Sequence, residues 1–234
     1  MRGHFILALL VALATSGVCR AQVIGEEPLT PITTSVTRPF LFDTSVSYTT
    51  ELYNSLPNYN NEGYSDLYFE AARRAVGLSF DAFMPRLPFL SAGIGAGVEK
   101  ESYRGSYSWT GDHPTMSAYR IVPDVHFKVD FWVLYLQLGA SCAILMNADS
   151  FQTTDPVYAG INPDCLTPSV FYGYAELGIR VWRVVLAIGN RHYWSEPFDI
   201  DRLSYYKRYQ YRSASLGNSC LFFRIGIELF SNYR

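Results

Sequence analysis

One short stretch of this sequence carries a nucleophile and a general base. The segment Asn190–Glu196 contains His192 and Ser195. A histidine that takes the proton of a serine hydroxyl starts acyl-transfer chemistry, but only when the two side chains are within hydrogen-bond reach. Period-two alternation from Val184 places His192 on one face of a strand and Ser195 on the opposite face. We therefore expect that His192 and Ser195 are not catalytic.

Motifs that bind phosphate or metal are missing from the sequence. It contains no Gly-rich phosphate loop, no Cys-x-x-Cys, no His-Glu-x-x-His and no Gly-x-Ser-x-Gly. Its four histidines do not cluster at metal spacing. The sequence therefore predicts no metal and no cofactor.

The ionic residues follow a second pattern, which is clearest from Tyr119 to Phe131. One face of this segment is apolar, and the other carries charged residues. Charges enclosed in a narrow space must pair, because an unpaired ion there is costly. We expect these side chains to fill and plug an interior, with a proton or ion path as the alternative. The predicted internal ion network consists of Glu99, Arg120, Asp124, His126, Lys128, Glu176, Arg180, Arg224 and Glu228.

Alternation of the same kind recurs along the chain, whereas a sustained 3.6-residue period is absent. It predicts an all-β fold of eight strands, and the weakest pattern is that of the first. The predicted strands are Thr44–Leu52, Ala75–Met84, Leu90–Glu99, Tyr119–Phe131, Val133–Met146, Ser169–Val181, one that begins at Val184, and Leu221–Leu229.

The links between these strands predict the topology. Short links at Pro85–Phe89, near Phe131–Val133 and near Trp182–Arg183 alternate with four long ones. An antiparallel up-and-down meander with tight turns at one end and long loops at the other is typical of transmembrane β-barrels. Because the number of strands is even, the first strand begins and the last strand ends on the short-turn side. Pro123 falls inside a strand, where we expect it to mark a bulge.

The whole segment from about residue 40 to 234 resembles small eight-stranded outer-membrane proteins, such as the OmpA transmembrane domain and OmpX, in a Bacteroidota-like version. The resemblance is one of architecture and rests on no family-specific motif. The C-terminus departs from the usual aromatic ending, because Phe230 is followed by four more residues. The resemblance implies an integral outer-membrane protein of a Gram-negative cell.

The N-terminus has the features of a targeting segment. A weakly basic start, the apolar run Phe5–Thr15 and a small-x-small site before Gln22 predict a signal peptide over residues 1–21. Residues 22–40 are predicted to be a periplasmic lead-in, and residues 41–234 the barrel. Removal of the signal leaves Cys142, Cys165 and Cys220, an odd number that predicts free thiols.

These features predict a non-enzymatic outer-membrane barrel with a plugged lumen, which acts in envelope structure or in binding through its long loops. The expected partners are membrane lipid, lipopolysaccharide, and an envelope or secretion-complex protein. The net charge of −2 gives no reason to expect nucleic acid. The alternatives are a lipid A acyl hydrolase at the outer rim and a soluble lipocalin-like ligand-binding barrel. The loop residues that suggest binding are Tyr53, Tyr59, Asn60, Asn61 and Tyr64 in the first long link, and Tyr205, Tyr206, Lys207, Arg208, Tyr209, Tyr211 and Arg212 in the last.

Overall fold

The computed structural model describes residues 41–51, 54–55, 59–61, 69–84, 86–105, 113–153, 158, 161–199, 201–203, 211–213 and 218–232. For residues 54–55, 59–61, 211–213 and 218 it describes the backbone only. The predicted signal peptide and lead-in lie outside these residues.

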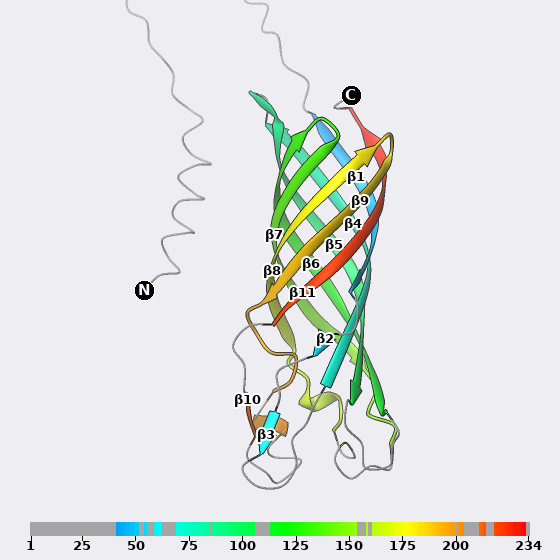
Figure 1. The fold of residues 1–234 in the computed structure, drawn as a ribbon, viewed down its shortest axis with the longest axis vertical. Helices are drawn as coiled ribbons and strands as arrows, with labels where there is room; N and C mark the ends of the chain where they lie inside the picture. Colours follow the sequence, from blue (N-terminus) through cyan, green and yellow to red (C-terminus); the bar gives the residue numbers. More distant parts are fainter. Residues whose placement is uncertain are drawn as a thin grey trace, which may run out of the picture. The chain divides into compact units, whose positions relative to one another are not determined.

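Eight long strands form the barrel, and they follow one another around it in chain order (Figure 1). Among the described residues of the links lie three shorter strands and one 3₁₀ turn, η1. The barrel strands are β1 (Phe42–Glu51), β4 (Phe69–Met84), β5 (Leu87–Gly105), β6 (Thr115–Phe131), β7 (Leu134–Ala148), β8 (Ser169–Val181), β9 (Val184–Tyr193) and β11 (Asn218–Ser231). The link elements are β2 (Asn54–Ser55), β3 (Tyr59–Asn61), η1 (Pro163–Cys165) and β10 (Tyr211–Ser213).

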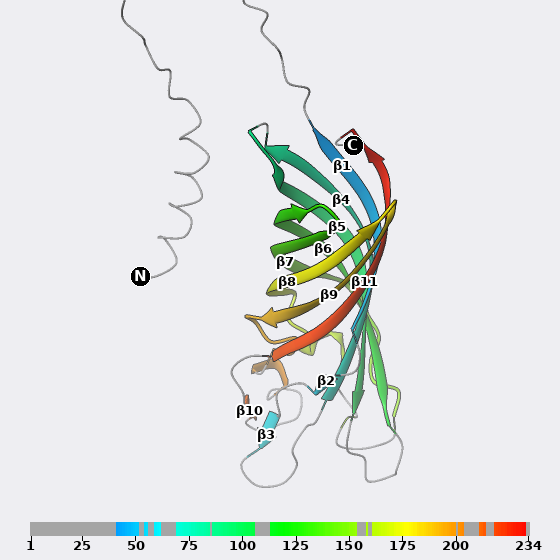
Figure 2. The same ribbon diagram turned by 45° about the horizontal axis from the view of Figure 1, so that its top comes forward.

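The first strand closes the ring, because β1 pairs antiparallel with both β4 and β11 (Figure 2). Asp43 pairs with Ser231, so the first and last barrel strands meet at the end of the barrel that carries the short turns. The eight-stranded antiparallel up-and-down barrel is therefore confirmed, as is the alternation of short and long links. No helix among the described residues is both long and apolar enough to cross a lipid bilayer.

The two faces of the barrel wall differ in polarity as predicted. Large apolar side chains point outward, with Val76 55 % and Ile94 63 % exposed. Charged side chains point inward and are buried, such as Arg120 at 0 % and Glu176 at 1 %. The β8 pattern of alternately buried and exposed residues matches the prediction throughout Ser169–Val181. The interior of the barrel is thus ionic and most of its outer surface is apolar.

Two adjacent strands are longer than predicted at the long-loop end. β4 begins at Phe69 rather than Ala75, and β5 continues to Gly105 rather than ending at Glu99. These strands and β6 form a wall that extends further toward the loops than β8, β9 and β11 (Figure 1). The wall provides an inward surface on which the loops pack.

Pro123 does not mark a bulge, so that prediction was wrong. Pro123 stays in register with Ala96 on β5. Toward β7 the pairing is interrupted between Ile121 and Asp124, because proline has no N–H to donate. The register shift in β6 lies instead between Tyr119 and Arg120.

A hydrophobic core closes the long-loop end of the barrel. Phe198 from the link after β9 stacks on Phe69 at 4.4 Å between ring centroids and packs on Tyr103 at 5.1 Å. The links after β7 and β9 are joined by backbone hydrogen bonds, including Asp199 N to Cys165 O at 2.8 Å. We call this hydrophobic core, together with the links after β7 and β9 that supply part of it, the cap. Its buried residues are Phe69, Ala71, Tyr103, Met116, Ala118, Phe151, Tyr158, Ile161, Cys165, Leu166, Phe198 and Leu203.

Candidate functional site

The predicted ion network lies inside the barrel, where its members divide into two groups. All nine side chains are on the lumen side of their strands, and only Asp124 and Arg224 are partly accessible. Glu99 and Arg120 lie toward the long loops, and the other seven lie toward the short turns. The structure therefore brings the nine residues into one lumen but not into one network.

We call the group toward the short turns the turn-side network. Asp81 is at its centre and contacts Lys128 Nζ at 2.5 Å and His126 Nε2 at 2.9 Å. The other nitrogen of His126 lies 2.7 Å from Asp124. Further pairs join Arg224 to Glu176 at 3.1 Å and Arg180 to Asp130 at 3.2 Å. The members of the turn-side network are Asp43, Asp81, Asp124, His126, Lys128, Asp130, Glu176, Arg180, Arg224 and Glu228.

Glu228 is the predicted residue for which the structure describes no cationic partner. It is 6 % exposed, and it forms no ion pair with any described residue. The acid beside it, Asp43, lies 3.7 Å from Arg180. The short-turn mouth of the lumen thus contains more carboxylates than cations.

Two glycines make room for the large groups of the turn-side network. Gly93 lies opposite both Asp81 and His126 in the sheet, and a Cβ at this position would collide with the His126 ring. A Cβ at Gly95 would collide with the Asp124 carboxylate in the same way. The small inward face of β5 is therefore what allows the β6 side chains to lie across the lumen.

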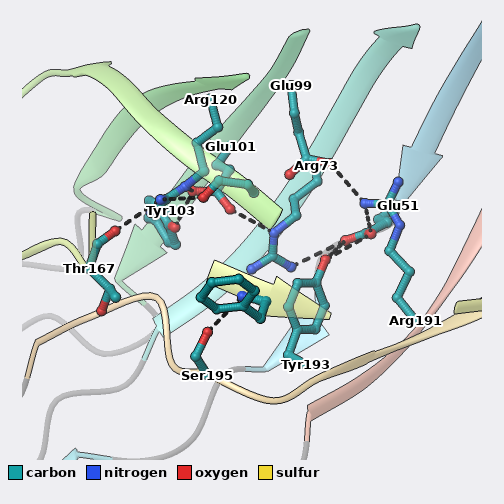
Figure 3. A network of polar contacts seen from close by, with 12 residues as sticks. Glu51, Arg73, Glu99, Glu101, Tyr103, Arg120, Thr167, Arg191, Tyr193 and Ser195 are labelled. Atoms are coloured by element: carbon teal, nitrogen blue, oxygen red, sulfur yellow. Dashed lines mark hydrogen bonds and ion pairs between the residues drawn. The ribbon is translucent and has the colours of Figure 1, made fainter. Parts of the chain in front are cut away.

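The second group, the loop-side network, is a chain of alternating arginines and glutamates (Figure 3). Arg73 bridges Glu51 at 3.2 Å and Glu101 at 2.9 Å. The chain continues from Glu101 to Arg120 at 2.6 Å. At its other end Arg191 contacts Glu51 at 2.6 Å and Glu99 at 2.8 Å. Its members are Glu51, Arg73, Glu99, Glu101, Arg120 and Arg191, three acids and three bases.

Tyrosines and backbone carbonyls complete the contacts of the loop-side network. Tyr103 donates to Glu101 at 2.5 Å, and Tyr193 donates to Glu51 at 3.1 Å (Figure 3). The guanidinium of Arg73 lies 4.3 Å from the centre of the Tyr193 ring. Arg120 donates to the carbonyl of Thr167, which ties the network to the link that carries part of the cap. These contacts offset the cost of burying six charges, since each charge has an ionic partner and most have a hydrogen bond as well.

Two small polar cavities lie in the lumen between described residues. One of about 60 Å³ is lined by residues of both networks, among them Asp124, His126 and Arg191. The other, of about 30 Å³, lies within the turn-side network. A buried water needs roughly 10–15 Å³ of such space, so each cavity has room for a few waters at most. Where the structure describes it, the lumen is therefore filled, and neither of these cavities is large enough for an organic ligand.

His192 and Ser195 are not hydrogen-bonded to each other. His192 is exposed on the outer face of β9, and its Nδ1 lies 3.0 Å from the hydroxyl of Ser219 on β11. Ser195 Oγ instead accepts a hydrogen bond from the backbone N–H of Phe171 at 2.8 Å. The two side chains thus have different hydrogen-bond partners: the hydroxyl of Ser219 for His192, and the backbone N–H of Phe171 for Ser195.

The three described cysteines form no disulfide, as predicted: Cys165 and Cys220 are buried and Cys142 is partly buried. No group of three or more His, Cys, Asp or Glu that could hold a metal ion occurs in the described part of the chain. No protein-family model matches the sequence, and no curated protein matches it either.

Proposed function

We propose that this protein is an integral outer-membrane β-barrel of a Gram-negative cell, closed to ions, that is not an enzyme and works through the long-loop end that it presents at the cell surface. The observation that carries the proposal is the polarity of the wall, which is apolar outside and ionic inside. In water such a surface would be a large exposed apolar patch, whereas in a bilayer it faces lipid.

The height of the apolar surface supports a membrane setting. On β4 the outward residues from Val76 to Met84 are apolar or Ala, and Arg74 precedes them. Met84 lies ten residues after Arg74. At a rise of about 3.3 Å per residue and a tilt of about 40°, these ten steps span about 25 Å along the barrel axis. That height matches the apolar band of about 25 Å in known outer-membrane barrels.

Aromatic residues at the short turns support the same setting. Trp132 and Trp182 are 92 % and 81 % exposed, and each begins a two-residue turn. Tryptophan is enriched at membrane–water interfaces, where its ring lies at the level of the headgroups. The two turns would place both indoles at the periplasmic interface.

The lumen argues against the soluble ligand-binding barrel. A lipocalin-like site needs an apolar cavity of several hundred Å³. Here the lumen cavities measure about 60 and 30 Å³ and are lined largely by polar side chains. The apolar grooves near Tyr48 lie on the outer wall, where lipid would cover them.

The closed lumen leaves the long-loop end as the place for interactions with partners. The cap occupies the mouth of the barrel, and β3 pairs with β10 so that the first and last long links are joined. The predicted binding residues in those links lie outside the described side chains. Envelope structure, and binding of lipopolysaccharide or an envelope or secretion-complex protein, are the roles that we propose for this end. The architecture is compatible with a relationship to the OmpA transmembrane domain and OmpX, in a Bacteroidota-type protein.

Membrane fractionation tests the proposal directly. We expect the protein in the outer-membrane fraction, and we expect its mobility on a detergent gel to differ between unheated and boiled samples. Recovery of native protein from the periplasm without detergent would contradict it.

Conductance in planar bilayers tests the closed lumen separately. With side chains of both networks filling the lumen, the protein should give no steady conductance. Stable channels of porin size would show that the lumen opens in a membrane.

A further inference from the structure

The outer wall of the barrel carries two cations that face each other on adjacent strands. Arg74 on β4 and Lys100 on β5 are register partners, and both are exposed. Directly opposed side chains in an antiparallel sheet have Cβ atoms about 5 Å apart, and like charges in such positions destabilise the sheet. An unfavourable pair of this kind can be offset by an anion that contacts both residues.

Neither cation has an acidic partner among the described residues. The carboxylates next to Lys100 in the chain, Glu99 and Glu101, point into the lumen and bind arginines there. The one described acid on the outer face of β4, β5 and β6 is Glu70, and it is paired with Arg104. Within the described part of the chain, the charge of Arg74 and Lys100 is therefore left without a counter-charge.

Two further side chains complete the surface around this pair. Tyr119 on β6 is the register partner of Lys100, whose ammonium lies 5.8 Å from the centre of the Tyr119 ring. Thr50 on β1 is the register partner of Arg74. The row Thr50–Arg74–Lys100–Tyr119 thus places a threonine, two cations and a tyrosine on four adjacent strands.

The height of this row decides which anion it would meet. Val76 and Val98 lie two residues closer to the short turns than Arg74 and Lys100. They are register partners and belong to the apolar band. The cations therefore lie at the edge of that band on the long-loop side. In a membrane this is the level of the lipid headgroups of the outer leaflet, where phosphate is the available anion.

We propose that Arg74 and Lys100 form a binding site for the phosphate of an anionic lipid in the outer leaflet. This inference rests on the proposed membrane location. The lipid's acyl chains would lie against Val76 and Val98, and its phosphate would bridge the two cations and remove their mutual repulsion.

Native mass spectrometry of the detergent-solubilised full chain can test the site. Phosphatidylglycerol, phosphatidylcholine and inorganic phosphate would be titrated separately. We expect phosphatidylglycerol to bind more tightly than phosphatidylcholine. The double variant Arg74→Gln/Lys100→Gln should bind phosphatidylglycerol about 25-fold more weakly, since each basic residue near an anionic lipid surface contributes about fivefold.

A charge-matched control separates this site from general surface charge. Arg86→Gln/Arg183→Gln removes two exposed cations at the short turns and should leave the tight phosphatidylglycerol binding unchanged. Equal losses in both double variants, or no loss in the first, would overturn the site. Inorganic phosphate that binds as tightly as the lipid would overturn the headgroup assignment.

The membrane location is checked independently of this site. Each variant is first tested for a heat-modifiable barrel in the outer-membrane fraction. A barrel that inserts normally but shows no preference for the anionic lipid contradicts the lipid site alone. A wild-type chain that does not insert contradicts the proposed function.

Discussion

Glu101 is the residue on which the loop-side network depends most. Its two carboxylate oxygens bind different arginines, Arg73 at 2.9 Å and Arg120 at 2.6 Å, and it is 1 % exposed. The substitution Glu101→Gln keeps the shape of the side chain but leaves two buried guanidiniums short of a counter-charge. We expect it to lower the free energy of unfolding by about 3 kcal/mol, since removal of one partner from a buried pair costs about 3–5 kcal/mol.

Urea titration of the folded, heat-modifiable band measures this loss, and Glu70→Gln is its matched control. Glu70 also pairs with an arginine, Arg104, but on the outer face, where the two side chains are 25 % and 38 % exposed. Exposed pairs contribute about 0–1 kcal/mol, so this variant should remain close to wild type. Equal effects of the two substitutions would show that burial of the network does not matter for stability.

The contact between His192 and Ser219 leads to a second prediction at this scale. Both side chains are exposed on the outer wall, and among the described residues no acid is hydrogen-bonded to His192 to orient its imidazole. Mass spectrometry of lipid A from cells with wild type, His192→Ala, Ser219→Ala or no protein should give identical acylation. Acyl loss that requires the protein and disappears in either variant would identify an acyl hydrolase instead.

Residues of the loop-side network show where prediction from sequence ended. Glu99 and Arg120 were predicted, whereas Arg73 and Glu101 were not, although they continue the same inward alternation by two residues. The predicted strands ended when their outward residues ceased to be apolar, at Arg74 and Lys100. In a bilayer the outward face changes from lipid to headgroups at this height, so the apolar signal ends while the strand continues. The inward charges themselves were the signal that could have found them.

At the scale of elements, the cap is the part that the sequence did not predict. The segments that complete it lie in long links without periodicity, and they are brought together by contacts such as Leu166 with Phe198 that are distant in the chain. The short turns were predicted in position but not in conformation. Trp132 and Trp182 both have positive φ, 63° and 57°, which costs a non-glycine residue about 1–2 kcal/mol. An indole at both sites in spite of this cost is consistent with a role at the membrane interface.

The cap can be loosened without opening the barrel. Phe198 is 1 % exposed and stacks on Phe69, and a buried Phe→Ala change costs about 3–5 kcal/mol. We expect Phe198→Ala to make residues 149–168 and 194–203 cleavable by protease added to intact cells. The variant should still give no steady conductance in planar bilayers, because the loop-side network lies on the short-turn side of the cap.

Phe171→Ala provides the comparison for the cap. Phe171 is on the outer wall and 49 % exposed, so its loss should leave the cleavage pattern unchanged. A steady current through the Phe198→Ala barrel would show that the cap, rather than the ion network, closes the lumen.

At the scale of the whole molecule, the strand number and the two unequal ends were predictable because they depend on local patterns. Each strand alternates by itself, and each link has a length that can be read from the chain. The same arrangement predicts orientation. A peptide tag after Arg234 should be inaccessible to antibody on intact cells, and a tag in the link between β5 and β6 should be accessible. Antibody labelling of the C-terminal tag on unpermeabilised cells would invert the proposed topology.

The seam between β1 and β11 has a consequence for the order of assembly. The hairpins β4–β5, β6–β7 and β8–β9 each join strands that are neighbours in the chain. Thr49 instead pairs with Arg224, and almost all of the barrel sequence lies between these two residues. Pairs so distant in sequence form late, since a long loop must close before they gain any contact. A nascent chain that lacks β11 would expose the unpaired edges of β1 and β9, which invite aggregation. The barrel can therefore close only after synthesis of its last strand, so the chain must be kept apart from its neighbours until it is complete.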